Sequence, residues 1–208
     1  MLHTRRTIRL AALLGALGTL LAAPAARADL RPAPAGSCTE PAVSKPFARW
    51  ADINDYFLLA GGSFEGATTG WTLSRAAVAN GNESFFVRSS ADRRSLSLQP
   101  GAVVHTPAFC IGVEHPAFRL FSRRTSGTWA GMRVDLKLTP TTGAPFYVGA
   151  GYVDGPSTTW QPSVALNLAR STSLTGTQKT MVQVRFTAES GGGAISLDDV
   201  FIDPYRRG

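Results

Sequence analysis

GSFEGATTGW at residues 62–71 and ISLDDV at residues 195–200 are the two stretches that decide the fold of this chain. The first predicts a glycine-led strand that carries Phe64 and Glu65 and runs into a short loop ending at Trp71. The second predicts a closing strand that carries two adjacent aspartates. Together the two stretches bracket one domain of the chain.

The sequence between the brackets is dominated by an alternation of apolar and polar residues with period two. Met132, Val134, Leu136 and Leu138 alternate with charged residues, which is typical of strands with one buried and one solvated face. Further strands are expected at 85–88, 95–98, 117–121, 146–153, 164–168, 182–186 and 195–202. Such frequent short strands predict an all-β fold of two packed antiparallel sheets, with a closed barrel as the alternative.

A short helical turn is expected before the first strand of the domain. Pro46 would open it, and the spacing of Phe47, Trp50 and Ile53 would bury one face of the turn.

The two brackets resemble the ends of galactose-binding-like jelly-roll domains, a fold shared by many carbohydrate-binding modules of secreted bacterial proteins. The resemblance implies a non-catalytic β-sandwich in which Trp71 packs inside. It also implies a structural calcium ion at the seam between the first and last strands, with Glu65 and one of Asp198 or Asp199 as ligands. The alternative is that Glu65 faces solvent and that the two aspartates cap a strand end.

Residues 1–28 have the features of a secretory signal peptide. Arginines precede an apolar run at 10–23, and a small-x-small cleavage site ends at Ala28. The run is shorter than the about 20 residues of a spanning helix, and no later segment is long and apolar enough. We therefore expect a secreted protein without membrane association, made of an extended arm at 29–46 and a single β-sandwich domain at 47–208.

The charge of the mature chain argues against a nucleic-acid partner. The full sequence has 21 basic and 14 acidic residues and a formal net charge of +7. The four charged residues of the leader are all arginines, so 17 basic residues remain after cleavage. They are scattered singly and in pairs rather than in a dense stripe, and we expect no nucleic-acid binding.

Cys38 and Cys110 are the two cysteines of the chain. In an exported protein they are expected to form a disulfide, which would pin the arm onto the domain. The alternative is lipidation at Cys38, because residues 35–38 faintly resemble a lipobox. The distance of Cys38 from the apolar run, and Ala35 in place of a branched aliphatic residue, count against lipidation.

Aromatic side chains beside predicted turns form a first set of candidate ligand-binding residues. A ring at a loop tip can stack on the apolar face of a sugar, whereas packing within the protein is the alternative. The members of this set are Trp129, Tyr147, Tyr152 and Trp160.

Polar side chains at outward strand positions form a second set. Arginine and carboxamide groups make paired hydrogen bonds to sugar hydroxyls or carboxylates, and three arginines favour an anionic glycan. Solvated ladders of ion pairs are the alternative. The members of this set are Arg119, Arg133, Asn167, Gln183 and Arg185.

The sequence contains no recognised catalytic motif. Glu114 and His115 are adjacent, but neighbours on a strand point to opposite faces, and a structural role is expected. We expect a non-catalytic protein that binds carbohydrate or cell-envelope glycan, with no cofactor other than calcium. The alternatives are a structural or interaction protein of the envelope with no glycan ligand, and a glycan-active enzyme.

Overall fold

The computed structural model describes residues 29–39, 41–155, 157–168 and 177–204, so the predicted signal peptide at 1–28 lies outside the described residues. These ranges contain β-strands and one short 3-10 turn, η1 (Ala48–Trp50). The strands are β1 (Val43–Ser44), β2 (Tyr56–Leu58), β3 (Thr72–Asn80), β4 (Arg94–His105), β5 (Phe109–Ile111), β6 (Ala117–Arg124), β7 (Gly131–Leu138), β8 (Phe146–Asp154), β9 (Gln161–Pro162), β10 (Leu166–Asn167), β11 (Thr180–Ala188) and β12 (Ile195–Ile202). Within the described ranges, no helix is long and apolar enough to cross a membrane.

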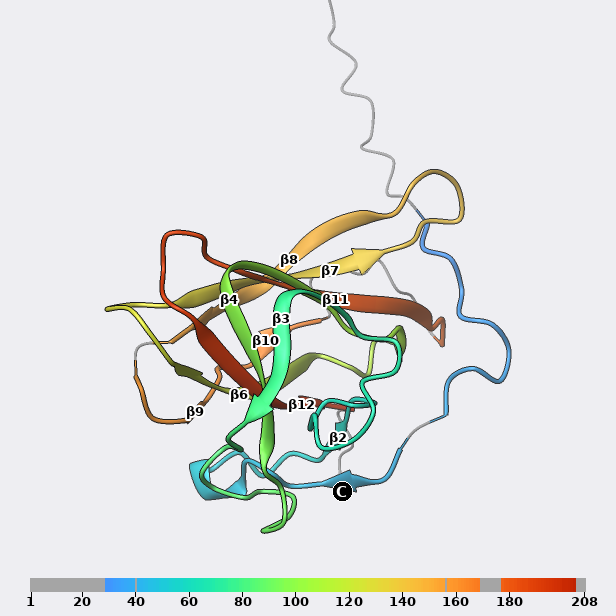
Figure 1. The fold of residues 1–208 in the computed structure, drawn as a ribbon. Helices are drawn as coiled ribbons and strands as arrows, with labels where there is room; N and C mark the ends of the chain where they lie inside the picture. The colour runs from blue at the N-terminus through green and yellow to red at the C-terminus, as the bar shows by residue number, and fades with distance from the viewer. Residues whose placement is uncertain (1–28, 40, 156, 169–176, 205–208) are drawn as a thin grey trace, which may run out of the picture.

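The strands form an antiparallel β-sandwich, as predicted. The sheet runs in the order β1-β2-β12-β4-β11-β7-β8, with β3 beside β4 and β6 beside β12. One layer holds β7, β8 and β11, and the other holds β2, β6 and β12 (Figure 1). The long strand β4 belongs to both layers, because residues 96–98 pair with β12 and residues 103–105 pair with β11.

The main core lies between the two layers. Met132, Val134 and Leu136 of β7 are fully buried there, and they belong to one cluster with Leu96 of β4 and Leu197 of β12. The period-two pattern of the sequence thus places one apolar row of each strand inside. Burying a side chain of this kind contributes about 1.5–3 kcal/mol to the stability of the fold.

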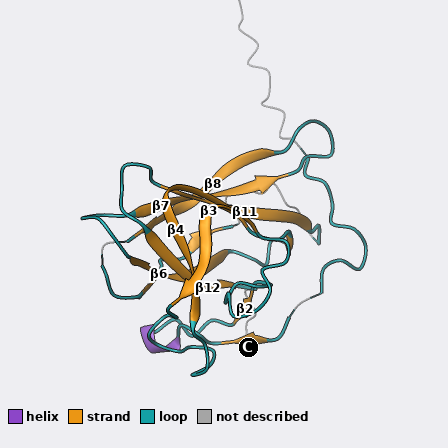
Figure 2. Cartoon of the chain, in the orientation of Figure 1, coloured by secondary structure: helices purple, strands orange, loops and turns teal. Residues whose placement is uncertain are grey.

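A second aromatic cluster covers the outer face of the β2-β6-β12 layer. Along β6, Phe118 and Leu120 point into the main core, whereas Phe121 points to the opposite side. There Phe121 stacks on Phe47, which precedes η1, with ring centroids 5.3 Å apart. Figure 2 shows η1 below this layer. This outer face is therefore closed to solvent.

Both brackets of the sequence take part in the core. Trp71 is 9% exposed, and its indole nitrogen donates a hydrogen bond to the carbonyl of Ala60 at 2.9 Å. The ring lies edge-on to Phe64, whose side chain is fully buried. The expected packing of Trp71 into the sandwich is confirmed.

The arm is attached to the domain by a covalent bond and by backbone pairing. Cys38 and Cys110 form the predicted disulfide. Upstream of it, the amide of Arg31 donates to the carbonyl of Thr139 at 2.9 Å, and Leu30 is 3% exposed. The start of the arm thus extends the sheet rather than lying in solvent.

Four local predictions were wrong. The strand expected to carry Phe64 and Glu65 does not form, because residues 60–63 form turns and Phe64 has a φ of 59°, which a strand does not allow. Ile53 is 72% exposed, because η1 ends at Trp50 and does not reach it. Residues 85–88 form turns instead of a strand, since the Glu83 carboxylate accepts hydrogen bonds from the amides of Phe85 and Val87. The strand expected at 164–168 shrinks to Leu166–Asn167.

Candidate functional site

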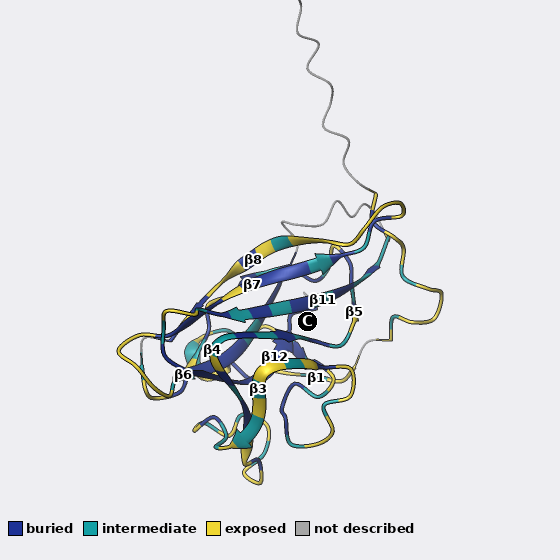
Figure 3. Cartoon of the chain, turned by 45° about the horizontal axis from the view of Figure 1, so that its top comes forward, coloured by how far each residue is buried: buried dark blue, intermediate teal, exposed yellow. Residues whose placement is uncertain are grey.

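The outer face of the other layer remains open. The strand registers place Asp135 opposite Arg185, and Lys137 opposite both Gln183 and Tyr147. We call this surface the Tyr147 face, and Figure 3 shows exposed residues along β8 at its edge. Its members are His105 of β4, Gln183 and Arg185 of β11, Arg133, Asp135 and Lys137 of β7, and Tyr147 and Tyr152 of β8.

Tyr147 is held in a fixed orientation by two neighbours. The guanidinium carbon of Arg185 lies 3.6 Å from the centre of the phenol ring, which is a cation–π contact. Nε2 of His105 lies 3.1 Å from the Tyr147 hydroxyl. Because the side chain is still 40% exposed, the ring is both positioned and accessible.

Asp135 is the carboxylate that organises the arginines of the face. Its Oδ2 accepts hydrogen bonds from Nη2 of Arg185 at 2.8 Å and from Nε of Arg133 at 3.1 Å. The Asp135 side chain is 9% exposed, so this pairing is only weakly screened by water. The pair fixes Arg185 beneath Tyr147 rather than leaving it free in solvent.

The charges on the Tyr147 face are mostly positive. Arg133, Lys137 and Arg185 stand against one carboxylate, Asp135. Burial lowers the pKa of His105, and the positive charges of Lys137 and Arg185 lower it further.

Tyr152 and Trp129 lie toward the other end of β7. The Tyr152 hydroxyl lies over Gly131, at a position that a side chain on residue 131 would occupy, and Tyr152 is 41% exposed. Burial raises the pKa of Tyr152, as do the charges of Glu189 and Asp154. Trp129 rests against the turn at Gly191 and Gly192 between β11 and β12.

Four predicted ligand residues lie outside the Tyr147 face: Trp129 and three residues of the covered layer. Trp160 is 3% exposed within the second aromatic cluster, because Arg123 and Phe121 surround it, and it is not a ring at an open loop tip. Arg119 points to that same covered face, where it binds Asp52 at 2.6 Å. Asn167 belongs to β10, which pairs with β6 in the covered layer.

Lys137 and His105 are members of the Tyr147 face that the sequence set did not contain, whereas the alternation along residues 132–138 already places Asp135 outward. Lys137 follows the alternation of β7 and its position could have been found from periodicity. The proximity of His105 depends on the pairing of β4 with β11, which carries no local sequence signal.

The seam where the two brackets meet is acidic: Asp198 and Asp199 are buried there, and Glu65 is half-buried. Oε1 of Glu65 accepts hydrogen bonds from the amides of Arg93 and Arg94 at 2.7 and 2.6 Å. Oδ2 of Asp198 accepts one from the amide of Glu83 at 2.8 Å. These two carboxylates therefore fasten the segment between β3 and β4 against β12 and against the turn region that carries Glu65.

Asp199 differs from its neighbours, because both of its carboxylate oxygens are buried and have no hydrogen-bond partner. Its backbone adopts a φ of 47°, at the point where the register of β12 with β6 shifts. Burial raises the pKa of Asp199 to about 7, against the opposing charge of Arg88. Burial and the charge of Asp199 raise the pKa of Asp198 to about 9.

The unpartnered carboxylate of Asp199 is the feature of the seam that fits a divalent cation. A buried carboxylate with two unpartnered oxygens is costly unless a cation or a donor satisfies it. In the described part of the chain, however, no three acidic, histidine or cysteine side chains converge as a ready metal-binding group. A cation bound by Asp199 would therefore need backbone carbonyls to complete its shell.

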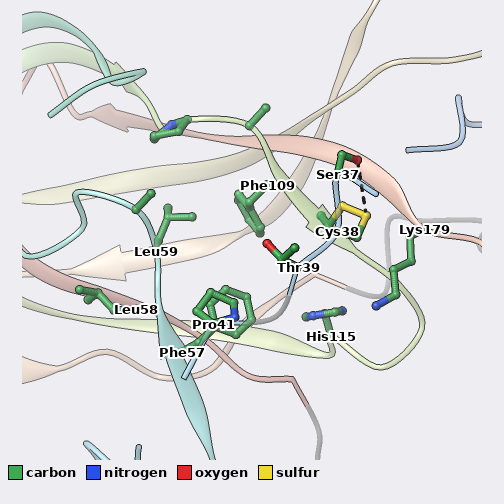
Figure 4. Close-up of a pocket in the computed structure, with 14 residues that line it drawn as sticks. Ser37, Cys38, Thr39, Pro41, Phe57, Leu58, Leu59, Phe109, His115 and Lys179 are labelled. Carbon is green, nitrogen blue, oxygen red and sulfur yellow. Dashed lines mark hydrogen bonds between the residues drawn. A yellow bond between two sulfur atoms is a disulfide. The ribbon is translucent and has the colours of Figure 1, made fainter. Parts of the chain in front are cut away.

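A cavity of about 220 Å³ lies between the arm and the domain, beside the disulfide (Figure 4). Phe57, Leu59 and Phe109 provide much of its apolar lining, and His115 and Lys179 lie at one side. Nζ of Lys179 forms a salt bridge with Glu114 at 2.8 Å, and Nδ1 of His115 accepts a hydrogen bond from the amide of Gly112. These contacts hold the turn between β5 and β6.

Comparison with known proteins yields similarity at the level of structure. No family model matches the sequence, and no curated protein matches it. The structure is similar to the N-terminal modules of Clostridium thermocellum endo-1,4-β-D-xylanase 10B, solved with xylohexaose, with a TM-score of 0.50 and 10% identity over 68% of this chain and 27% of that chain.

Two further solved structures have lower TM-scores. The xylan-binding family 22 module of Paenibacillus barcinonensis xylanase 10C has a TM-score of 0.48 and 14% identity, with 71% of this chain and 94% of that chain covered. A family 61 module in complex with β-1,4-galactotriose has a TM-score of 0.41 and 13% identity, covering 70% and 96%. At these identities the likeness concerns the fold alone. The chain therefore has the jelly-roll β-sandwich fold of carbohydrate-binding modules, as the brackets at 62–71 and 195–200 predict.

Proposed function

We propose that this protein is an exported, non-catalytic domain that binds glycan on the Tyr147 face. The observation that carries the proposal is the exposed Tyr147 ring, held by Arg185 on one side and by His105 at its hydroxyl. A ring that is fixed before binding loses little conformational entropy when a sugar stacks on it.

The surroundings of Tyr147 supply the polar contacts that a sugar needs. Arg133 is 58% exposed at its side chain and presents guanidinium donors, whereas Gln183 adds a carboxamide on the neighbouring strand. A few convergent polar groups beside an aromatic surface are typical of sites that orient a ligand. The opposite outer face is covered by η1 and its aromatic cluster, which leaves the Tyr147 face for this role.

Export is part of the same proposal. The disulfide between Cys38 and Cys110 fits an oxidising compartment outside the cytoplasm. The leader-like composition of residues 1–28 agrees with this location.

The proposal also includes one structural calcium ion at the seam. Asp199 would be its main carboxylate ligand, because both of its oxygens are buried without a partner. Glu65 would contribute its second oxygen, and Asp198 would lie next to the ion. When bound, the cation would neutralise buried negative charge where β12 meets the loop after Gly62.

A glycan array followed by affinity electrophoresis tests the binding role. We expect wild-type protein to be retarded by at least one polysaccharide, and Tyr147→Ala to lose about tenfold or more in affinity. Trp129→Ala is the matched control, since this exposed ring lies against the Gly191–Gly192 turn outside the Tyr147 face, and its retardation should equal that of wild type.

Two results would contradict the proposal. If no glycan binds, the envelope interaction role without a glycan ligand becomes the better interpretation. If binding survives in Tyr147→Ala but is lost in Trp129→Ala, the ligand lies elsewhere on the molecule.

A further inference from the structure

Three nitrogen-bearing side chains lie around Tyr147 on three different strands. His105 of β4 is in contact with the Tyr147 hydroxyl, Arg185 of β11 lies over the ring, and Lys137 of β7 stands directly opposite Tyr147 in the strand register. The pairing of β4 with β11 and of β11 with β7 fixes their relative positions. The cluster is therefore built into the sheet and does not depend on loops.

The positive charge of this cluster is only partly compensated. Asp135 is the carboxylate that pairs with it, and it is shared between Arg185 and Arg133. Among the described residues, no carboxylate forms a salt bridge with Lys137, whose Nζ lies 3.4 Å from Oε1 of Gln183. Burial lowers the pKa of His105, and the charges of Lys137 and Arg185 lower it further, which disfavours a positive charge on the imidazole itself.

The balance of charge differs between the two ends of the face. Near Tyr152, at the start of β7, Asp154 and Glu189 are the acidic groups that act on the Tyr152 phenol. At the other end, beside Tyr147, the side chains are Lys137, His105 and Arg185. Arg133 stands opposite Tyr152 in the register, beside these two carboxylates, whereas Lys137 lies opposite Tyr147 with no carboxylate partner among the described residues. A ligand that lies along β7 and β8 would thus find the less compensated positive charge at the Tyr147 end.

We infer that the ligand of the Tyr147 face is a glycan that carries carboxylates, with one carboxylate placed between Lys137 and the Arg185–His105 pair. This inference rests on the proposed function and names its ligand class. Lys137 supplies a mobile point charge, whereas Arg185 is already fixed by Asp135 and supplies directed donors. A neutral glycan would stack on Tyr147 but would leave the charge of Lys137 without a partner.

The test compares the same hexasaccharide with charged carboxylates and with neutral methyl esters. A hexamer of galacturonic acid and the same hexamer with its carboxylates methyl-esterified are titrated into the full protein by calorimetry at low and at physiological salt. We expect the acid to bind about tenfold tighter than the ester at low salt, with the difference shrinking as salt is added.

Two lysine variants test whether a carboxylate of the ligand binds at Lys137. Lys137→Gln should lower the affinity for the acid by about three- to tenfold and leave the affinity for the ester unchanged. Lys45→Gln is the control. It removes the same charge from a residue outside the Tyr147 face, where Lys45 pairs with Asp55, and it should leave both affinities unchanged. Thermal melting of both variants confirms that they are folded.

Each alternative result has a defined meaning. Equal binding of acid and ester would overturn the inference while leaving glycan binding intact, and so would an unaltered affinity of Lys137→Gln for the acid. Equal binding of hexaglutamate and the galacturonate hexamer would also overturn it, because the surface would then take any polyanion. Binding of neither hexamer, together with an empty glycan array, would contradict the proposed function itself.

Discussion

The guanidinium carbon of Arg185 lies 3.6 Å from the centre of the Tyr147 ring, while Nη2 of the same side chain donates to Asp135 at 2.8 Å. Arg185 thus contacts an aromatic face and a nearly buried carboxylate at once. This double contact requires a planar, delocalised cation with several donors, which a lysine does not provide. The orientation of Tyr147 is therefore linked to the presence of Asp135 on the neighbouring strand β7.

Replacing Arg185 by lysine tests this geometry separately from charge. Arg185→Lys keeps the positive charge but loses the stacked plane and the directed donors, so we expect glycan affinity to fall by about fivefold or more. Arg94→Lys, a surface arginine whose amide rather than side chain binds Glu65, is the matched control and should bind as wild type. Equal affinities of Arg185→Lys and wild type would show that only charge matters at this position.

Removing the disulfide should destabilise the protein. The bond joins residues 72 apart in sequence, and closing a loop of this length contributes about 4 kcal/mol in the chain-entropy model. We expect the Cys38→Ser, Cys110→Ser variant to lose about this much free energy of unfolding in a urea titration. An unchanged unfolding midpoint would mean that the arm is held by its backbone pairing at Arg31 alone.

Truncation of two tryptophans should lower the free energy of unfolding by very different amounts. Trp160→Ala removes a ring that is 3% exposed and should cost about 3–5 kcal/mol of unfolding free energy. Trp129→Ala removes a ring that is 47% exposed, and its loss should be much smaller. Denaturant unfolding of the two variants measures the difference, and equal losses would contradict the burial of Trp160.

Asp52 should make the stability depend on pH in the acid range. Burial tends to raise its pKa, but hydrogen bonds from Tyr56 and Arg119 outweigh this and leave the pKa below the ordinary value of 3.8. A carboxylate with a lowered pKa contributes stability above its unfolded pKa, and the contribution is lost as the pH falls through the folded pKa.

Asp52→Asn should therefore cost about 1–3 kcal/mol at neutral pH, with the gap to wild type closing below about pH 4. Asp154→Asn, an exposed carboxylate on β8, is the control and should follow wild type across the whole range. A constant gap between wild type and Asp52→Asn at all pH values would contradict the assigned ionisation.

Calcium should raise the melting temperature if the seam binds it. A cation at a hundred times its dissociation constant stabilises the folded state by about 2.7 kcal/mol, which is readily visible in a melting curve. Asp199→Asn should abolish the shift and Asp154→Asn should retain it. Identical melting curves with calcium and with a chelator would remove the structural ion.

Periodicity in the sequence predicted the strands that have one apolar face, and it did so because burial imposes the pattern directly. Residues 132–138 and 182–186 are examples, and both became regular strands of the sandwich. The turns at 85–88 escaped prediction, because they depend on the buried carboxylate of Glu83. The backbone amide of Glu83 is in turn held by the carboxylate of Asp198, which is more than a hundred residues away in sequence.

The candidate site was predictable only in part for a related reason. Alternation shows that a side chain points outward, but it does not show which of two sheets the strand joins. Arg119 and Arg185 have the same local pattern, yet one faces the covered layer and the other faces the open one. The difference arises from η1 and Phe47, whose docking site is not encoded near either arginine.

The aromatic cover over the β2-β6-β12 layer limits how the molecule can engage a polymer. With Phe47, Phe121 and Trp160 covering that side, one broad sheet face of the described residues, the Tyr147 face, is left open for recognition. A single copy would therefore be monovalent and unable to crosslink two polysaccharide strands by itself. Any bridging of polymers would require several copies displayed together, so that avidity would become a property of their arrangement and not of the fold.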